Sequence, residues 1–337
     1  MTETEPRNRS IGSAGSSACA VTDSVPESLA TTRSEPTPLA RLPHPRSETV
    51  TKLALVADPH VSADREGTWK VFHRTETRLR TALADADDRD VDGVVFAGDL
   101  TEDGRPRDFD LVADLLAELD APVVAVPGNH DVPKSFKDHE TPPVSAFESR
   151  FAPGSFPHRA EIGDADVLAL NAATAPDGSL EDTHDGAIGN DQLAWLESTL
   201  PETTAPVVVT HHNLAGLGAR IDVDGSLPHP PVEGAAELGS LVADHDALHV
   251  SGHVHLPAMT RYRGANGLIC PALSSFPQAY ALAEIGPTGT TVRLVPVADE
   301  RGLAEAYELA QNHSNRSATV VDLVANQLAD LPLIDER

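Results

Sequence analysis

Short runs of Val, Leu and Ala alternate with longer amphipathic segments from residue 51 to about residue 255. The short runs predict strands that are buried on both faces, at residues 53–58, 91–99, 122–129, 167–171, 206–212 and 247–255. Apolar residues at helical spacing predict helices at residues 69–88, 106–119, 189–200 and 233–245, and another near 319–331. Strands that alternate with helices predict an α/β protein, with a mostly parallel sheet and helices on its faces.

The remaining segments follow other patterns. Residues 258–297 have the pattern of short antiparallel strands with a turn at residues 286–289, which predicts a second sheet packed beside the first. Residues 1–48 are acidic and rich in Ser, Thr and Pro, without apolar periodicity, so we expect a disordered tail. No linker-like segment follows until about residue 300. This favours one domain over residues 49–300, followed by a helical extension over residues 301–337.

The charge balance of the chain is strongly acidic. Its 52 Asp and Glu residues outnumber its 25 Lys and Arg residues and give a formal net charge of −27. An acid excess with scarce Lys and few aromatic residues is typical of proteins from salt-loving microbes, so we expect a halophilic, haloarchaeal protein. The charge argues against nucleic-acid and anionic-membrane partners in ordinary salt, although it carries little weight in molar salt.

Cysteine content and hydropathy indicate where the protein works. Cys19 and Cys270 are the two cysteines of the chain and cannot build a disulfide framework. No apolar run reaches the length of a membrane span. Both features predict a cytoplasmic protein that does not bind a membrane.

Polar side chains able to bind a metal end five of the predicted strands. In chain order they are Asp58 and His60, Asp99, Asn129, the pair His211 and His212, and the pair His253 and His255. The carboxyl ends of the strands in an open α/β sheet meet at one edge, so we expect these side chains to converge there. His, Asp and Asn are ligands for first-row divalent metals, and the lack of Cys argues against a structural zinc site.

The number of candidate ligands favours two adjacent ions. With one His of the 211/212 pair, the strand ends supply seven ligands, whereas a tetrahedral ion uses four. Seven ligands with one bridging carboxylate suit two divalent ions, which can clamp a phosphoryl group and ionise a water molecule. Such a set accepts Mn, Fe or Zn, so the metals stay open. Each motif alone also fits an ordinary turn or a buried polar pair; the five together, in order and at strand ends, favour a site.

The motifs D-x-H, GD, GNHD, HH and GHxH, in this order, resemble those of the calcineurin-like metallophosphoesterase superfamily. The stretch GDLTEDG followed by GNHD is most similar to its class III cyclic-nucleotide phosphodiesterase branch. The resemblance covers residues 51–297 and implies a four-layer α-β-β-α sandwich with two central mixed sheets. It also implies that one ion is held by Asp58, His60 and His255 and the other by Asn129, His211 and His253, with Asp99 bridging both.

The resemblance implies further roles. His130 matches the family's catalytic His, which contacts the phosphate and helps the leaving oxygen depart. The group that orients it is open between Glu102, where the family commonly has Asp, and Asp131. His211 is preferred as the ligand because it lies first after the strand, which leaves His212 as a hydrogen-bonded neighbour.

Two segments are predicted to form the walls of the substrate pocket, residues 133–160 and residues 213–232. Their sequences do not spell out a ligand. Lys134, Lys137 and Arg220 lie in them and could contact a phosphate, although a solvated surface position is the plainer interpretation of each.

These inferences predict a dinuclear-metal-dependent phosphoesterase that hydrolyses a phosphodiester or a phosphomonoester by attack of metal-bound hydroxide. The expected substrate is a small phosphorylated molecule, and a cyclic nucleotide is the leading prediction. A DNA-processing nuclease of the same superfamily is the alternative, but no basic groove with interleaved aromatic residues is visible. A protein phosphatase is disfavoured because the Arg-bearing signature of that branch is missing after Gly98-Asp99. A non-catalytic metal-binding scaffold predicts eroded ligands, and none is eroded.

Overall fold

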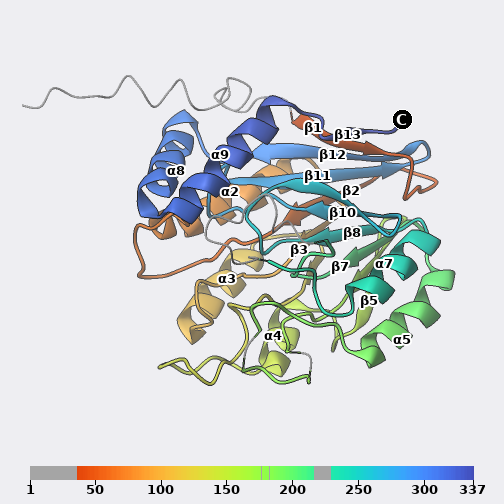
Figure 1. Cartoon of the computed structure of the whole chain (residues 1–337), viewed down its shortest axis with the longest axis horizontal. Coiled ribbons are helices and arrows are strands. Elements are labelled where there is room, and N and C mark those ends of the chain that lie inside the picture. The colour runs from red at the N-terminus through yellow and green to blue at the C-terminus, as the bar shows by residue number, and fades with distance from the viewer. Residues whose placement is uncertain (1–35, 176, 182, 216–228) are drawn as a thin grey trace, which may run out of the picture.

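The computed structural model describes residues 36–175, 177–181, 183–215 and 229–337. Two β-sheets pack face to face, and helices cover their outer sides (Figure 1). Most of the expected tail, Arg220 and most of the predicted wall 213–232 lie outside the described residues.

In the described part of the chain the first sheet has seven strands, in the order β13 (Ile334–Asp335), β1 (Thr37–Leu42), β12 (Gly289–Pro296), β11 (Ala279–Gly286), β2 (Thr51–Val56), β3 (Gly93–Phe96) and β4 (Val123–Ala125). β2, β3 and β4 run parallel, whereas β11 pairs antiparallel with both β2 and β12. The register sets Val56 beside Phe96 and Phe96 beside Ala125. The three parallel strands therefore end at the same level, and the loops that follow them leave from one edge.

The second sheet has six strands among the described residues, in the order β5 (His158–Ile162), β6 (Ala165–Ala169), β7 (Pro206–Val209), β8 (Leu248–Ser251), β10 (Ala265–Ile269) and β9 (Ala258–Tyr262). β6, β7, β8 and β10 run parallel, and the two outer strands pair antiparallel with their neighbours. Both sheets are therefore mixed.

Both faces of the first sheet are buried, which explains the uninterrupted apolar runs. On β2, Leu53 and Leu55 belong to the core between the sheets, whereas Ala54 and Val56 belong to the core under the helices α2 (Thr75–Asp88) and α3 (Pro106–Leu116). The helices α5 (Asn190–Thr199) and α7 (Ala235–Asp244) cover the second sheet through a third core. The predicted α-β-β-α sandwich is confirmed. The described residues also form the short helices η1 (Phe72–Arg74), α4 (Val144–Phe151) and η2 (Leu200–Glu202).

Two sequence predictions about strands need correction. Residues 1–48 were expected to be disordered, but Thr37–Leu42 form β1 and pair antiparallel with β12. Residues 258–297 were expected to build the second sheet, but they divide between the two sheets. β9 and β10 join the second sheet, which is otherwise formed by β5 to β8, whereas β11 and β12 lie in the first sheet.

Two predictions about helices also change. The helix expected over residues 69–88 begins only at Thr75, so Trp69 and Lys70 lie in the preceding loop. The helical extension expected over residues 301–337 contains two helices, α8 (Glu300–His313) and α9 (Asn315–Ala329), whereas only a helix near 319–331 was given bounds from the sequence. Both helices bury apolar side chains in the same core cluster as the sheets, so the described residues show no break in packing at residue 300.

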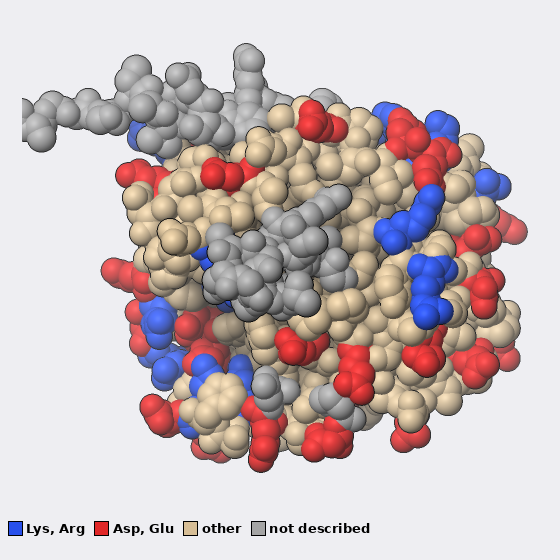
Figure 2. All heavy atoms as spheres, in the orientation of Figure 1, with Lys and Arg blue, Asp and Glu red and all other residues tan. Residues whose placement is uncertain are grey.

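The surface agrees with the acidic composition. Figure 2 shows Asp and Glu side chains spread over the displayed face, with Lys and Arg between them. Among the described residues, no helix has the length and apolarity needed to cross a bilayer.

Candidate metal centre

The loops after β2 and β3 continue the pairing of these strands beyond their ends. The backbone N–H of Asp58 donates to the carbonyl of Gly98 (3.1 Å), and that of His60 donates to the carbonyl of Asp99 (2.9 Å). The side chains of Asp58, His60 and Asp99 therefore meet at one edge of the first sheet.

The second sheet delivers its histidines to the same place. The backbone N–H of Gly252 donates to the carbonyl of His211 (3.0 Å), which holds the loops after β7 and β8 together. The backbone N–H of His253 lies 3.1 and 3.0 Å from the two carboxylate oxygens of Asp58. The convergence predicted at the carboxyl ends of the strands is therefore observed, and it joins the two sheets.

The backbone at this edge is conformationally unusual. It is left-handed at five candidate ligands, with φ of 51° at Asp58, 43° at His60, 53° at Asp99, 69° at His253 and 57° at His255. Residues other than glycine rarely adopt this conformation, which costs on the order of 1–3 kcal/mol each and clusters at functional sites. The fold retains this strain where the side chains must converge.

Two glycines of the motifs make room for the carboxylates. A Cβ atom at Gly128 would overlap the carboxylate of Asp99, and one at Gly252 would lie 2.5 Å from Oδ2 of Asp58. The glycines in GNHD and GHxH are therefore required because the carboxylates of Asp99 and Asp58 lie too close to the backbone to leave room for a Cβ atom.

Asp58, His60 and His255 form one cluster of potential ligands, with one ligand atom of each within 4.8 Å of the others. Nε2 of His255 lies 3.4 Å from Oδ1 of Asp58 and 3.1 Å from Nε2 of His60. Nδ1 of His255 lies 2.8 Å from Oγ of Ser275, a contact that orients the ring with Nε2 towards the cluster.

A second cluster surrounds Asn129. Its Oδ1 lies 3.2 Å from Nε2 of His211 and 3.1 Å from Nδ1 of His253. Nδ1 of His211 donates to the carbonyl of Ala97 (2.8 Å), which points Nε2 at the cluster. Burial opposes protonation, but Asp99 raises the pKa of His211 to about 9, so a metal ion would displace the proton on Nε2. Oδ2 of Asp99 lies 3.4 Å from Nε2 of His60 and 3.4 Å from Nε2 of His211. Asp99 thus faces both clusters, as a bridging carboxylate would.

The chemistry of this donor set fits divalent cations. Asp58 and Asp99 are almost completely buried, and their ion-pair contacts are with histidines. Burial raises the pKa of Asp58 to about 7, although His211 opposes the shift. Burial also disfavours the ionised form of Asp99, but His211 holds the pKa of its carboxyl group well below its usual value. Divalent cations bound between these carboxylates and the facing imidazoles would neutralise the buried carboxylate charges and use the imidazole nitrogens as ligands.

His130 is oriented by a backbone group. The backbone N–H of His130 donates to Oδ1 of Asp99 (2.9 Å), and its ring nitrogen Nδ1 donates to the backbone carbonyl of Glu102 (2.5 Å). Nε2 of His130 lies 3.4 Å from Nζ of Lys70. The sequence left open whether the side chain of Glu102 or that of Asp131 orients His130. In the structure neither does, because the backbone carbonyl of Glu102 makes the contact.

The carboxylate of Asp131 ties two loops together. Its oxygens accept hydrogen bonds from the backbone N–H groups of Leu100 (2.9 Å), Thr101 (2.9 Å) and Gly128 (3.0 Å), and from the Thr101 hydroxyl (2.8 Å). Asp131 therefore fixes the loop that carries Asp99 against the loop that carries Asn129.

The two adjacent histidines point in different directions. Nε2 of His212 donates to the carbonyl of Thr183 (2.9 Å), whereas Nε2 of His211 faces Asp99 and Asn129. This geometry supports the prediction that His211 is the ligand and His212 a hydrogen-bonded neighbour.

Comparison with known families identifies the chain. The family model for calcineurin-like phosphoesterases matches residues 51–257. The chain belongs to this family. It is therefore a metal-dependent hydrolase of phosphoric esters, as the motifs predicted.

Several relatives of this phosphoesterase are named as phosphodiesterases. A probable cyclic nucleotide phosphodiesterase of Synechococcus sp. is 26% identical over 71% of this chain and 89% of the relative. A 3′,5′-cyclic adenosine monophosphate phosphodiesterase of Haemophilus influenzae is 24% identical over 66% of this chain and 76% of the relative. A glycerophosphodiester phosphodiesterase of Enterobacter lignolyticus is 29% identical over 54% of this chain and 62% of the relative.

Solved structures support the fold. A dimetal phosphatase from Danio rerio aligns with a TM-score of 0.58 at 15% identity, over 75% of this chain and 98% of that chain. A purple acid phosphatase from yellow lupin aligns with a TM-score of 0.53 at 14% identity, over 77% of this chain and 53% of that chain.

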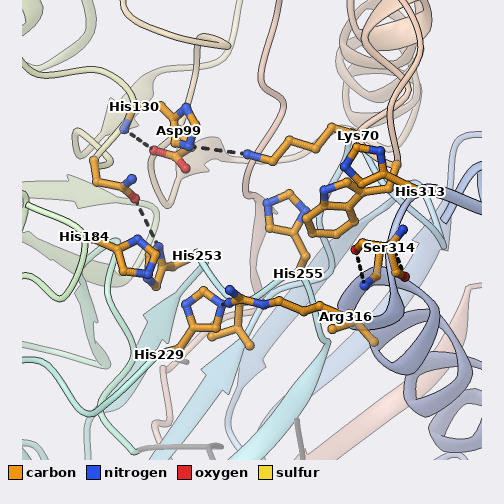
Figure 3. A pocket seen from close by; sticks show the side chains of 15 residues that line it. Lys70, Asp99, His130, His184, His229, His253, His255, His313, Ser314 and Arg316 are labelled. Carbon is orange, nitrogen blue, oxygen red and sulfur yellow. Dashed lines mark hydrogen bonds between the residues drawn. The ribbon is translucent and has the colours of Figure 1, made fainter. Parts of the chain in front are cut away.

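A pocket of about 230 Å³ opens over the candidate metal centre of the phosphoesterase (Figure 3). Its lining includes side chains that the sequence did not single out: Trp69, Lys70, His184, His229 and Arg316. Nζ of Lys70 lies 3.0 Å from Nε2 of His60, next to the proposed ligands.

The predicted pocket walls are only partly correct. His229, from the expected wall 213–232, lines the pocket, but in the described part of the chain no residue of 133–160 does. Lys134 donates to the backbone carbonyl of Asn129, and Lys137 forms an ion pair with Asp103 (2.6 Å). Residues from the loop before α2 and from the α8–α9 junction take the place of 133–160 because those segments fold over the strand ends.

Proposed function

We propose that the protein hydrolyses a small phosphodiester at a centre of two divalent ions, with a cyclic nucleotide as the leading candidate substrate. The observation that carries this proposal is the position of Asp99, whose Oδ2 is equally distant from imidazoles of two separate clusters. The names of the relatives support a phosphodiester as the substrate class.

In this proposal each side chain has a defined task. One ion is held by Asp58, His60 and His255 and the other by Asn129, His211 and His253, with Asp99 shared. When bound, the ions would supply the positive charge that polarises the phosphoryl group and makes water a stronger acid. His130, held at Nδ1 by the Glu102 carbonyl, presents Nε2 to a phosphate oxygen or to the leaving oxygen.

The acid excess supports a halophilic enzyme, and the two cysteines suit the reducing cytoplasm, so the test is run in molar KCl as well as in dilute salt. Protein stripped with a chelator and reconstituted with Mn, Fe or Zn is assayed on bis-p-nitrophenyl phosphate, p-nitrophenyl phosphate, cyclic nucleotides and single-stranded DNA. We expect diester hydrolysis that is lost with the chelator and restored by metal. The Asp99→Asn variant is the inactive control. Hydrolysis of the monoester alone, cleavage of single-stranded DNA in preference to small diesters, or chelator-resistant activity would contradict the proposal.

A further inference from the structure

The pocket over the metal centre has a wall that belongs to the C-terminal helices. Its lining includes four residues at the junction of α8 and α9: His313, Ser314, Arg316 and Ser317. We infer that Arg316, positioned by His229, forms a second anion-binding subsite, so that the substrate is a phosphodiester carrying a second anionic group, a carboxylate or a phosphoryl group. This inference rests on the proposed phosphodiesterase function and narrows its substrate class to diesters other than a simple 3′,5′-cyclic mononucleotide.

Arg316 is held close to the metal centre by a buried imidazole. Its NH2 group donates to Nε2 of His229 (2.7 Å), and Figure 3 shows the side chain reaching from α9 towards that ring. His229 is only 8% exposed, and its ring stands perpendicular to that of His253, with 4.4 Å between the ring centroids. The guanidinium group is therefore separated from a proposed metal ligand by a single imidazole ring.

The contact between Arg316 and His229 fixes both groups. An arginine N–H can donate only to an unprotonated ring nitrogen, so His229 is neutral and carries its proton on Nδ1. A neutral imidazole orients the guanidinium group but does not neutralise its charge. His229 is thus a positioning residue, and Arg316 is the group that would contact the ligand.

Most of the hydrogen-bonding capacity of Arg316 is left for a ligand. A guanidinium group has five N–H donors arranged to bind a carboxylate or phosphate in bidentate fashion, and the described residues take up one contact of Arg316, to His229. Other arginines are neutralised by carboxylates, as in the pairs Arg159–Asp166 (2.6 Å) and Arg293–Glu284 (2.8 Å). Arg316 has no carboxylate partner among the described residues, so its charge is available to an anion in the pocket.

The charge of the lining also favours an anion. Asp99 is the only carboxylate among the described residues that line the pocket, and it already belongs to the metal centre. Lys70 lies at the metal centre, where Nζ contacts His60 and His130, so it faces the position of the phosphate to be cleaved. Arg316 approaches from the other side of the pocket (Figure 3). Lys70 and Arg316 therefore define two separate anion positions, one at the metal centre and one beside Arg316. A phosphodiester with a single charge would occupy only the position at the metal centre.

A matched pair of substrates tests this inference. The 2-carboxyethyl and propyl esters of p-nitrophenyl phosphate share one leaving group and differ in a terminal carboxylate. The metal-loaded protein is expected to show a KM at least about tenfold lower for the carboxyethyl ester, because a charge-assisted bidentate contact is among the stronger hydrogen-bonded interactions. Arg316→Gln should abolish this preference, so that KM becomes equal for the two esters. Arg316→Lys should retain part of it.

Arg301→Gln is the matched control variant. It removes the same charge from an exposed position on α8 that does not line the pocket, so the preference should persist. Equal KM values of the unaltered protein for the two esters would overturn the inference, and so would a preference that survives in Arg316→Gln, since the carboxylate would then be bound by another group.

Equilibrium binding separates this inference from the proposed function. Calorimetric titration of the metal-loaded protein with 3-phosphonopropionate and with propylphosphonate measures the same difference without turnover. If the affinity difference depends on Arg316 while neither ester is hydrolysed, the subsite stands and the proposed function fails. If both esters are hydrolysed with equal KM, the proposed function stands and the subsite fails. A 3′,5′-cyclic mononucleotide has no second anionic group, so a carboxylate preference would favour a linear diester over that candidate.

Discussion

Replacement of His130 by Gln should separate metal binding from chemistry. The backbone N–H of His130 contacts Asp99, and this contact does not depend on the side chain. The seven proposed ligands do not include the His130 imidazole, so the variant should bind two metal equivalents and fold normally. The variant loses the ring nitrogen Nε2. In the unaltered protein this nitrogen points into the site because Nδ1 of the same ring is hydrogen-bonded to the Glu102 carbonyl.

The size of the effect follows from the role of that nitrogen. A lost general acid lowers kcat by roughly 10²- to 10⁴-fold, which corresponds to about 3–5 kcal/mol in the activation barrier. Burial, with a further contribution from Lys70, lowers the pKa of His130 to about 3 in the metal-free protein, so the ring is neutral there. A phosphate anion beside Nε2 favours the protonated form. The full loss is expected for an alkyl leaving group, whereas p-nitrophenolate departs without a proton and should show little of it.

The assay compares kcat for an alkyl phosphodiester and for bis-p-nitrophenyl phosphate, together with metal content by elemental analysis. Glu102→Gln is the control, because the backbone and not the side chain of Glu102 holds His130, and its kcat should stay within about threefold of the unaltered protein. The catalytic assignment would be refuted by an unchanged rate of His130→Gln on the alkyl substrate, by an equal loss on both substrates, or by loss of a metal equivalent.

Three further substitutions test the rest of the centre. Asp99→Asn should lower metal content at both positions because the carboxylate faces both clusters, and elemental analysis that finds two full equivalents would contradict the bridge. His211→Ala should lose one equivalent while His212→Ala keeps both, and the opposite result would identify His212 as the ligand. Asp131→Asn should lower the free energy of unfolding by about 2–5 kcal/mol, because an amide cannot accept all the hydrogen bonds that the carboxylate receives. A denaturant titration that shows a change below about 1 kcal/mol would disprove this role.

The sequence predicted the parts of the fold in which local pattern and tertiary environment agree. β2, β3 and β4 are buried on both faces, so their runs of apolar residues have no polar interruption until the strands end. The polar residues that follow are the candidate ligands, which is why the edge of the sheet and its metal-binding chemistry could both be inferred from the order of the motifs.

Elements stabilised by distant partners were missed. The segment TPLARL contains Pro and Arg and has little strand character of its own, and it becomes β1 by pairing with β12, more than 200 residues later in the chain. In β1, tertiary pairing outweighs the local signal. α8 lies within the helical extension expected over residues 301–337, but its bounds were not predicted, and its buried positions Gly302, Ala306 and Ala310 are small.

Residues that line the pocket from outside the motifs were also missed. Lys70 was assigned to a helix, but the chain is left-handed at Thr68 and Val71, so Lys70 lies in a loop that folds over the site. Arg316 follows the capping residue Ser314 at the start of α9 and resembles any exposed helical arginine in sequence. Neither residue has a spacing that marks it, because its position depends on the packing of whole segments.

The tetrapeptide GNHD illustrates how closely the tasks of the site are combined. Gly128 admits the Asp99 carboxylate, Asn129 offers an oxygen to the second cluster, His130 presents an imidazole, and Asp131 fastens the loop to its neighbour. Sequence reasoning looked for a side chain to orient His130, whereas a backbone carbonyl, which every residue possesses, makes that contact. Substitutions at these neighbouring positions should therefore have distinct consequences: loss of a metal ion at Asn129, loss of rate at His130 and loss of stability at Asp131. A common outcome at all three would mean that the loop acts only as a structural unit.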